Sequence, residues 1–365
     1  MTNRIPKITV KQEVKEMSHW RNPQLRDIVC LIGGFETKLD EDDNTHIDKP
    51  KFYKTLAEAE ADLRDNSEQS LPEANKALRQ IFHESINGVL VVNISTFTGS
   101  DTRTWSRTVT TEKLAAALTS VADIEFDLLY VADTLSDTII EQIDTDAKAR
   151  FENKKPYGYV GVCTRANVSA YTTTAAKMGN FCYAMLTQTL TINGTELSAI
   201  ESGAYLTNLI ATLPVGNSLT AKRLPEVTGV GTEYTFGASD MGAVLVGLGY
   251  FVVRLLNPLE NTYECVNSAT NNGLDLYINR CRDYIVNDFA LRQFLGEKSN
   301  NITLQGIKTE CNAILIKFKD DLGVVEGINY SVEKVDSNTA NIILNTVEFA
   351  GIITDINVFM TIEVV

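Results

Sequence analysis

The side chains that most often carry catalysis are few in this sequence and lie far apart. Histidine occurs at His19, His46 and His83, and none of the three stands near a nucleophile motif such as GxSxG. A zinc site would need closely spaced ligands, as in HExxH, and that spacing does not occur in the sequence. We interpret His83 as a half-exposed helix residue rather than a general base. The sequence therefore predicts no catalytic residues and no metal site.

Cysteines and acidic residues likewise do not form a recognisable site. The six cysteines contain no CxxC pair: Cys30, Cys163, Cys182, Cys265, Cys281 and Cys311. A chain of 365 residues does not depend on disulfides for its stability, so we interpret them as reduced core thiols. The acidic run at 40–43 lacks the alternating ligands and central glycine of a calcium loop, and we interpret it as solvated.

The glycine pairs do not predict a nucleotide site. Gly33-Gly34 follows an apolar run, but the chain contains neither GxGxxG nor GxxxxGK[ST]. A phosphate site needs the glycine turn directly at a helix N-terminus, where backbone amides reach the anion. The next predicted helix begins about twenty residues later. We therefore predict no cofactor.

Alternating strand and helix patterns predict an α/β layer over residues 27–230. Short continuous apolar runs predict strands buried on both faces, at 27–32, 88–94, 126–131 and 157–162. Periods of three and four residues predict helices between them, among them 111–121 and 137–151. Parallel neighbours require such crossovers, so the sheet should be mainly parallel.

A second, α+β domain is predicted over residues 231–354. The glycine, proline and serine content of 214–231 is typical of a domain crossing. Two amphipathic helices follow, one from Gly273 and one capped by Thr303 and ending at Gly323. A hairpin is predicted around residues 331–344. At this length two domains are the expected organisation.

Both ends of the sequence have the pattern of a strand with one apolar face. We predict an N-terminal arm over residues 1–26 and a C-terminal linking strand over 355–365. The apolar positions are Ile5, Ile8 and Val10 at one end and Ile356, Val358, Met360, Ile362 and Val364 at the other. Such strands need a sheet to join, and unpaired strand edges favour association. The two ends together indicate an assembly subunit.

Charge and hydropathy exclude several classes of partner. The net charge of −14 and the pI near 4.8 argue against a nucleic-acid surface. No apolar run reaches the roughly 20 residues of a membrane span, and the N-terminus lacks the apolar region of a signal peptide. We expect no membrane insertion, and we expect synthesis in the cytoplasm.

Cations on the two C-terminal helices allow two interpretations. They are Arg280, Arg282, Arg292, Lys308, Lys317 and Lys319. They form either a solvated outer face or a surface that meets an acidic partner, since complementary charge fixes register and orientation.

The order of these features resembles the contractile tail sheath proteins of bacteriophages and phage-tail-like bacteriocins. The resemblance covers most of the chain, although 95–195 is similar only in pattern. It rests on Ile32–Phe35, Phe52–Glu60, Ala77–Asn93, Ala211–Thr220, Val335–Thr339, Val347–Gly351 and the strand Ile356–Val364. The chain is similar to the small two-domain type, because no extra outer domain of the larger phage sheaths is apparent.

The resemblance implies a subunit of a helical sleeve, built from stacked hexameric rings around an inner tube. In that family, N- and C-terminal strands add to sheets of neighbouring subunits, by β-augmentation. The α/β domain faces outward and the C-terminal domain faces the tube, so Lys308, Lys317 and Lys319 become candidate tube-facing residues. Other implied partners are the baseplate and tail terminator proteins.

The implied function is contraction that drives the tube through a target cell envelope. The implied location is a virion or phage-tail-like particle that is assembled in the bacterial cytoplasm. Two other functions remain open from the residues alone. One is an α/β enzyme with an unrecognised active site, and the other is a non-contractile shell or surface-layer subunit.

Overall fold

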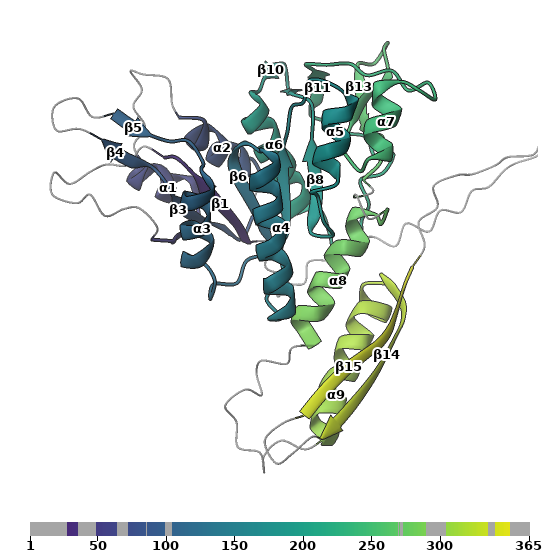
Figure 1. Cartoon of the computed structure of the whole chain (residues 1–365). Coiled ribbons are helices and arrows are strands. Elements are labelled where there is room, and N and C mark those ends of the chain that lie inside the picture. Colours follow the sequence, from purple (N-terminus) through teal and green to yellow (C-terminus); the bar gives the residue numbers. More distant parts are fainter. Residues whose placement is uncertain are drawn as a thin grey trace, which may run out of the picture.

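The computed structural model describes residues 28–35, 49–63, 72–84, 86–98, 104–268, 270, 273–289, 304–334 and 340–350. The predicted linking strands at 1–26 and 355–365 lie outside these residues. Most of the described chain forms one large layered body, and the last helix and hairpin extend from it (Figure 1).

A six-stranded sheet of order β2-β3-β1-β6-β7-β8 forms the centre of the large body. Its strands are β1 (Ile28–Gly33), β2 (Lys51–Tyr53), β3 (Gly88–Asn93), β6 (Leu128–Thr134), β7 (Gly158–Val162) and β8 (Cys182–Leu186). Every neighbouring pair is parallel except β2 with β3. The mainly parallel sheet predicted from the apolar runs is confirmed.

Helices cover both faces of this sheet, which explains why its central strands are buried along most of their length. One face packs against α1 (Leu56–Asp62), α2 (Glu73–Ile81) and α6 (Ala199–Thr212). The other packs against α3 (Thr111–Ser120), α4 (Asp137–Glu152), α5 (Val168–Ala175) and α7 (Met241–Gly247). Side-chain caps begin five of these helices, at Thr55, Thr110, Ser136, Asn167 and Ser198.

Small antiparallel sheets complete the large body. They are β4 (Thr96–Thr98) with β5 (Thr104–Ser106), β10 (Thr195–Glu196) with β9 (Leu190–Ile192) and β11 (Val227–Val230), and β12 (Val253–Asn257) with β13 (Thr262–Cys265). Residues such as Leu245, Val252 and Tyr263 pack in the cores of the large sheet. The segment 241–265, which lies beyond the predicted crossing, therefore packs with the α/β layer. The division into domains stays a prediction.

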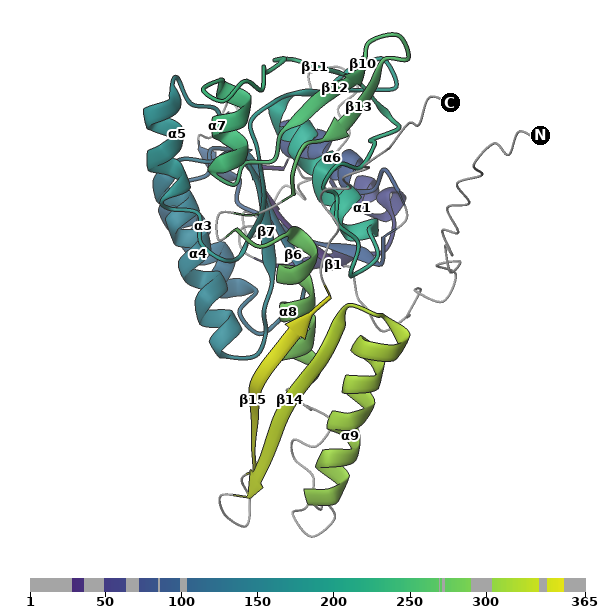
Figure 2. The ribbon, with the colours of Figure 1, turned by 90° about the vertical axis from the view of Figure 1, so that its right-hand side faces the viewer.

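The C-terminal part has a separate core. It consists of α8 (Leu276–Phe289), α9 (Leu304–Ile316), a π-helical turn (Lys317–Asp321), β14 (Val325–Lys334) and β15 (Ala340–Phe349). Cys281, Ile285, Phe318 and Leu322 are among its buried residues. Figure 2 shows α8 between the large body and the hairpin, with α9 beside β14.

Most predicted elements are confirmed, and the differences have identifiable causes. Gly323 ends the second helix at φ +58°, as its C-cap position predicts. The hairpin is longer than predicted on both strands, and β2 was not predicted, because three residues are too few for a periodic signal. All six cysteines are free and buried. No helix in the described ranges is long and apolar enough to cross a membrane.

Candidate functional site

The carboxyl end of the parallel sheet is where an α/β enzyme would bind its ligand, because strand order reverses there around β1. In this chain a connecting segment occupies that position. A Cβ placed on Gly34 would lie 2.6 Å from both the Cβ and the backbone oxygen of Arg107. The backbone N–H of Val109 donates to Asp133 Oδ2 at 3.2 Å. Gly34 therefore permits close packing of the segment at 107–109.

Two polar side chains beside this turn, Asn93 and Ser95, form hydrogen bonds with the backbone of Phe35. Asn93 Oδ1 accepts from the backbone N–H of Phe35 at 3.0 Å, and Ser95 Oγ donates to Phe35 O at 2.6 Å. Phe35 itself is fully buried. The Gly33-Gly34 turn thus holds an aromatic anchor in the core, and this geometry differs from a phosphate-binding turn.

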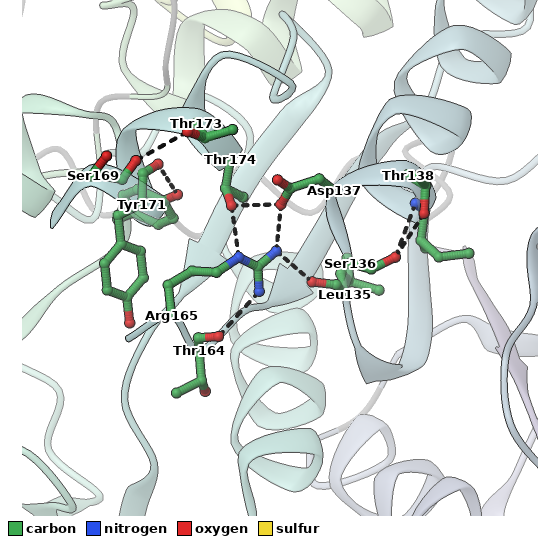
Figure 3. Close-up of polar contacts among 12 residues, drawn as sticks. Leu135, Ser136, Asp137, Thr138, Thr164, Arg165, Ser169, Tyr171, Thr173 and Thr174 are labelled. Atoms are coloured by element: carbon green, nitrogen blue, oxygen red, sulfur yellow. Dashed lines mark hydrogen bonds and ion pairs between the residues drawn. The ribbon is translucent and has the colours of Figure 1, made fainter. Parts of the chain in front are cut away.

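A second polar cluster lies at the ends of β6 and β7, where Arg165 joins three segments (Figure 3). Its Nη2 donates to Asp137 Oδ1 at 2.7 Å and to Leu135 O at 2.9 Å, and its Nη1 donates to Thr164 O at 3.1 Å. Its Nε donates to Thr174 Oγ1 at 2.7 Å, and that hydroxyl donates to Asp137 Oδ1 at 2.6 Å. The guanidinium is engaged on all three nitrogens.

The electrostatics of the cluster favour a structural role. Burial acts to raise the pKa of Asp137, but the Thr174 hydroxyl and the Arg165 guanidinium outweigh it and lower that pKa. Asp137 occupies the first turn of α4, where a negative charge is stabilised by the helix dipole. Asp137 itself therefore supplies the negative charge at the N-terminus of α4. Its bond with Thr174 links α5 to α4.

His83 is held in a small cluster that differs from the prediction. It follows the C-terminal end of α2 instead of lying on the helix. Its Nε2 lies 2.9 Å from Glu226 Oε2, and the Tyr205 hydroxyl donates to the same oxygen at 3.0 Å. The cluster connects α6 to the loop before β11. Among the described residues no group of three or more His, Cys, Asp or Glu could hold a metal ion.

A shallow pocket of about 100 Å³ lies beside β12. Its lining is Val230, Glu233, Tyr234, Phe236, Val253, Arg254 and Leu255. Arg254 Nε donates to Glu264 Oε1 at 2.7 Å, so its charge is neutralised inside the chain. The pocket is smaller than the roughly 300 Å³ of an ordinary ligand site.

Helix α8 is bound to the large body by buried charges. Arg282 Nε donates to Asp283 Oδ1 at 2.7 Å, and the Tyr183 hydroxyl of β8 donates to Asp283 Oδ2 at 2.6 Å. The Arg282 guanidinium also lies over the Phe181 ring at 4.7 Å. Arg280 Nη1 donates to Leu213 O at 2.8 Å.

These contacts correct one interpretation of the C-terminal cations. Arg280 is 2% exposed and Arg282 packs on aromatic rings, so neither forms a solvated or partner-binding face. Both instead fix α8 to the α/β layer. Burial raises the pKa of Asp283 even though Arg282 and Tyr183 act to lower it. Arg292 lies outside the described residues.

The β14–β15 hairpin is the feature best suited to association. It forms a sheet of two strands, so each strand has one edge without a paired strand among the described residues. One face packs on α9, where the Tyr330 hydroxyl donates to Asn312 Oδ1 at 2.6 Å. A two-stranded sheet is marginal by itself, and open edges accept further strands.

The predicted site residues fall in different places. Lys308 and Lys319 are exposed, on α9 and the π-helical turn. Lys317 is largely buried, and its Nζ donates to Asp288 Oδ2 of α8 at 2.6 Å. The strand-linking residues lie outside the described ranges: Ile5, Ile8, Val10, Ile356, Val358, Met360, Ile362 and Val364. Their linking role and the tube-facing role of the lysines stay predictions.

Comparison with solved structures identifies the fold. A chain of the anti-feeding prophage baseplate superposes with a TM-score of 0.67 at 14% identity, covering 93% of each chain. A chain of the anti-feeding prophage helical sheath in its contracted state gives 0.65 at 15% identity, covering 99% of each. A sheath tail protein from Desulfitobacterium hafniense gives 0.61 at 13% identity, covering 88% of this chain and 97% of that one.

The chain therefore has the tail sheath fold, and the expected resemblance is confirmed at the level of the fold. The sequence itself matches no protein-family model and no curated protein. The fold extends over nearly the whole chain, and its mixture of a parallel sheet with small antiparallel sheets agrees with the α/β plus α+β expectation.

Proposed function

We propose that this chain is a structural subunit of a contractile tail sheath. In the proposal it polymerises as stacked hexameric rings around an inner tube, and contraction drives the tube through a target cell envelope. The observation that carries it is the likeness to the contracted anti-feeding prophage sheath over 99% of both chains. A fold alone does not establish function, so the argument also needs a site.

The hairpin supplies that site. Its two open edges match the two predicted linking strands in number. We propose that Ile5, Ile8 and Val10 of one neighbour, and the apolar residues of 356–364 of another, complete the sheet over α9. Heterologous contacts generate rings where the rotation closes and helical filaments where it does not, and stacked rings linked in this way form a helical sleeve.

The orientation in the particle follows from the same proposal. The α/β layer faces outward, and α9 with Lys308 and Lys319 faces the inner tube. Lys317 contributes less, because its charge is paired with Asp288. Baseplate and terminator proteins contact the ends of the sleeve. The proposed location is a virion or phage-tail-like particle, with no nucleic acid or cofactor bound.

The packing at the carboxyl end of the sheet disfavours the enzyme alternative. A doubly wound enzyme needs an accessible crevice there, and the segment at 107–109 occupies it. Nearby, Asp137 is paired with Arg165, and Asp133 accepts a hydrogen bond from the backbone N–H of Val109. The shell alternative shares the open edges but needs no inner tube.

Electron microscopy of truncated and substituted subunits tests the proposal. Removal of residues 356–365 should leave a folded protein that forms no sleeves, since one edge of each hairpin stays open. Val358→Asp with Ile362→Asp should have the same effect, because a charge on the apolar face prevents packing over the hairpin core.

The matched control is Asn357→Lys with Thr361→Lys, which places two charges on the opposite face of the same strand, beside the exposed Glu326, Glu333 and Glu348, and should leave sleeves intact. Circular dichroism and gel filtration establish that each variant folds. Sleeves formed by the truncated protein would refute the linking role. Discrete oligomers of the unaltered protein would favour an enzyme, and flat lattices a shell.

A further inference from the structure

The tip of the β12–β13 hairpin presents an exposed leucine. Leu259 is 97% exposed, whereas the other exposed large apolar side chains of the described residues are between 37% and 51% exposed. Single apolar side chains are common on protein surfaces, so exposure alone does not indicate a partner. Figure 2 shows this hairpin at the end of the molecule opposite β14 and β15. Leu259 therefore belongs to a different surface from the β14–β15 hairpin.

The turn that carries Leu259 is held in one conformation. The backbone N–H of Leu259 donates to Asn257 Oδ1 at 2.9 Å, and the ring of Pro258 restricts the φ angle between them. Asn261 adopts a φ of +49°, and its Nδ2 donates to Thr228 O of β11 at 2.8 Å. These bonds fix the tip to a neighbouring strand. A contact made by such a tip costs little conformational entropy on association.

The pocket beside β12 has the size of one aliphatic side chain. Its volume is about 100 Å³, and most of its lining is apolar or aromatic. An apolar cavity of roughly 150 Å³ binds benzene, so this pocket suits a group with fewer carbon atoms, such as the isobutyl group of leucine. Leu259 does not fill the pocket of its own chain, because its side chain is almost fully exposed.

Charges at the tip and beside the pocket are complementary. Arg254 and Arg223 both lie opposite Glu264 in neighbouring strands, which places the three side chains on one face. Arg254 and Glu264 neutralise each other at 2.6 Å, so the exposed Arg223 adds a positive charge to this face. The tip carries the exposed Glu260. Glu233 also lines the pocket, so the carboxylate of an approaching tip belongs on the Arg223 side.

We infer that Leu259 of one copy of this chain inserts into the pocket beside β12 of a second copy, with Glu260 facing Arg223. A second copy is the occupant favoured by these observations, because the chain itself supplies a fixed aliphatic side chain, a pocket of matching size and opposite charges. Interfaces depend on a few such anchors seated in pockets. The inference rests on the proposed function and adds one contact between neighbouring subunits of the sleeve.

Substitutions at the tip and in the pocket test the contact in the full chain. Leu259→Ser should raise the lowest protein concentration at which sleeves form by about tenfold or more, because the burial of a leucine is lost. Its thermal unfolding should not change, since the side chain is exposed in the subunit. Leu259→Met is the matched control and should assemble like the unaltered protein. Val230→Trp fills the pocket and should weaken assembly as Leu259→Ser does.

Cross-linking tests the same contact without removing it. The six native cysteines are buried, so introduced cysteines are the accessible thiols. One chain carries Leu259→Cys and a second, longer tagged chain carries Val230→Cys. Oxidation of mixed sleeves with diamide should give a disulfide-linked product that contains one chain of each kind, because the two Cα atoms must lie within about 7 Å. In the control, Thr195→Cys on the exposed β10 replaces Val230→Cys and should give no such product.

Three results would overturn the inference. They are normal assembly of Leu259→Ser, a cross-linked product formed by the Leu259→Cys chain alone, which would show that tips meet each other, and equal cross-linking to the Thr195→Cys control. Each of these removes only the Leu259 contact, as long as the unaltered protein forms sleeves. Failure of the unaltered protein to form sleeves would instead remove the proposed function.

Discussion

Asp283 illustrates how single residues hold the parts of this molecule together. Its carboxylate is 5% exposed and accepts hydrogen bonds from Arg282 of the same helix and from Tyr183 of the large sheet. Removing one member of a buried pair leaves an uncompensated charge, which is the costly case for buried ions. The residue therefore matters for the attachment of α8 to the α/β layer.

Asp283→Ala should destabilise the unassembled subunit by about 3–5 kcal/mol. Urea unfolding followed by circular dichroism measures the change. Asp123→Ala is the matched control. The Asp123 side chain is fully exposed although it contacts Lys155, so its loss should leave the free energy of unfolding nearly unchanged. Equal effects of the two substitutions would contradict the anchoring role of Asp283.

The Arg165 cluster makes a prediction about pH. The pKa of Asp137 is lower in the folded protein than its ordinary value of 3.8. The unfolded chain therefore binds its proton first as pH falls, and the stabilisation present above that value is lost at lower pH. Asp137→Asn should flatten the dependence of unfolding free energy on pH below about pH 5. An unchanged profile would show that the carboxylate is not stabilised by Arg165 and Thr174.

At the scale of elements, the turn after β1 shows how packing closes an end of the sheet. Gly34 has backbone and side-chain atoms of Arg107 where its Cβ would be. Gly34→Ala should cost about 1–3 kcal/mol of folding stability, since a connecting segment must move. Gly247→Ala is the control, because nothing lies within 4 Å of its added Cβ at the end of α7, and it should be neutral or slightly stabilising. Thermal unfolding of both variants measures the difference, and a neutral Gly34→Ala would contradict the packing.

The sequence predicts elements better than it predicts the contacts between them. Continuous apolar runs identify β1, β3, β6 and β7, because strands buried on both faces have a strong local signal. The burial of Arg280 could not be predicted, because its partner Leu213 O is a carbonyl 67 residues away. An arginine on an amphipathic helix is exposed in most cases, and here tertiary packing overrides that expectation.

The sequence also did not predict that the segment after residue 231 packs on the large sheet. The glycine- and proline-rich stretch at 214–231 predicts a crossing, and the chain after it still packs on the same sheet through Leu245 and Val252. The composition of a loop indicates its local conformation. It does not indicate which hydrophobic core the next helix or strand joins. The separate C-terminal core begins with α8.

At the scale of the whole molecule, a small two-stranded sheet is attached to a large layered body. Helix α8 connects the two, because Tyr183 of β8 donates to its Asp283 and Lys317 donates to its Asp288. Among the described residues, neither strand of the β14–β15 hairpin pairs with a third strand. Under the proposed function, neighbouring copies complete this sheet with the apolar strand patterns at the two ends of the sequence.

Cryo-electron microscopy of sleeves formed by the purified protein tests this claim most directly. We predict a four-stranded sheet over each α9, in which one added strand beside β14 and one beside β15 come from two different neighbouring subunits. Sleeves in which both edges stay bare, or in which a subunit's own ends fill them, would contradict it.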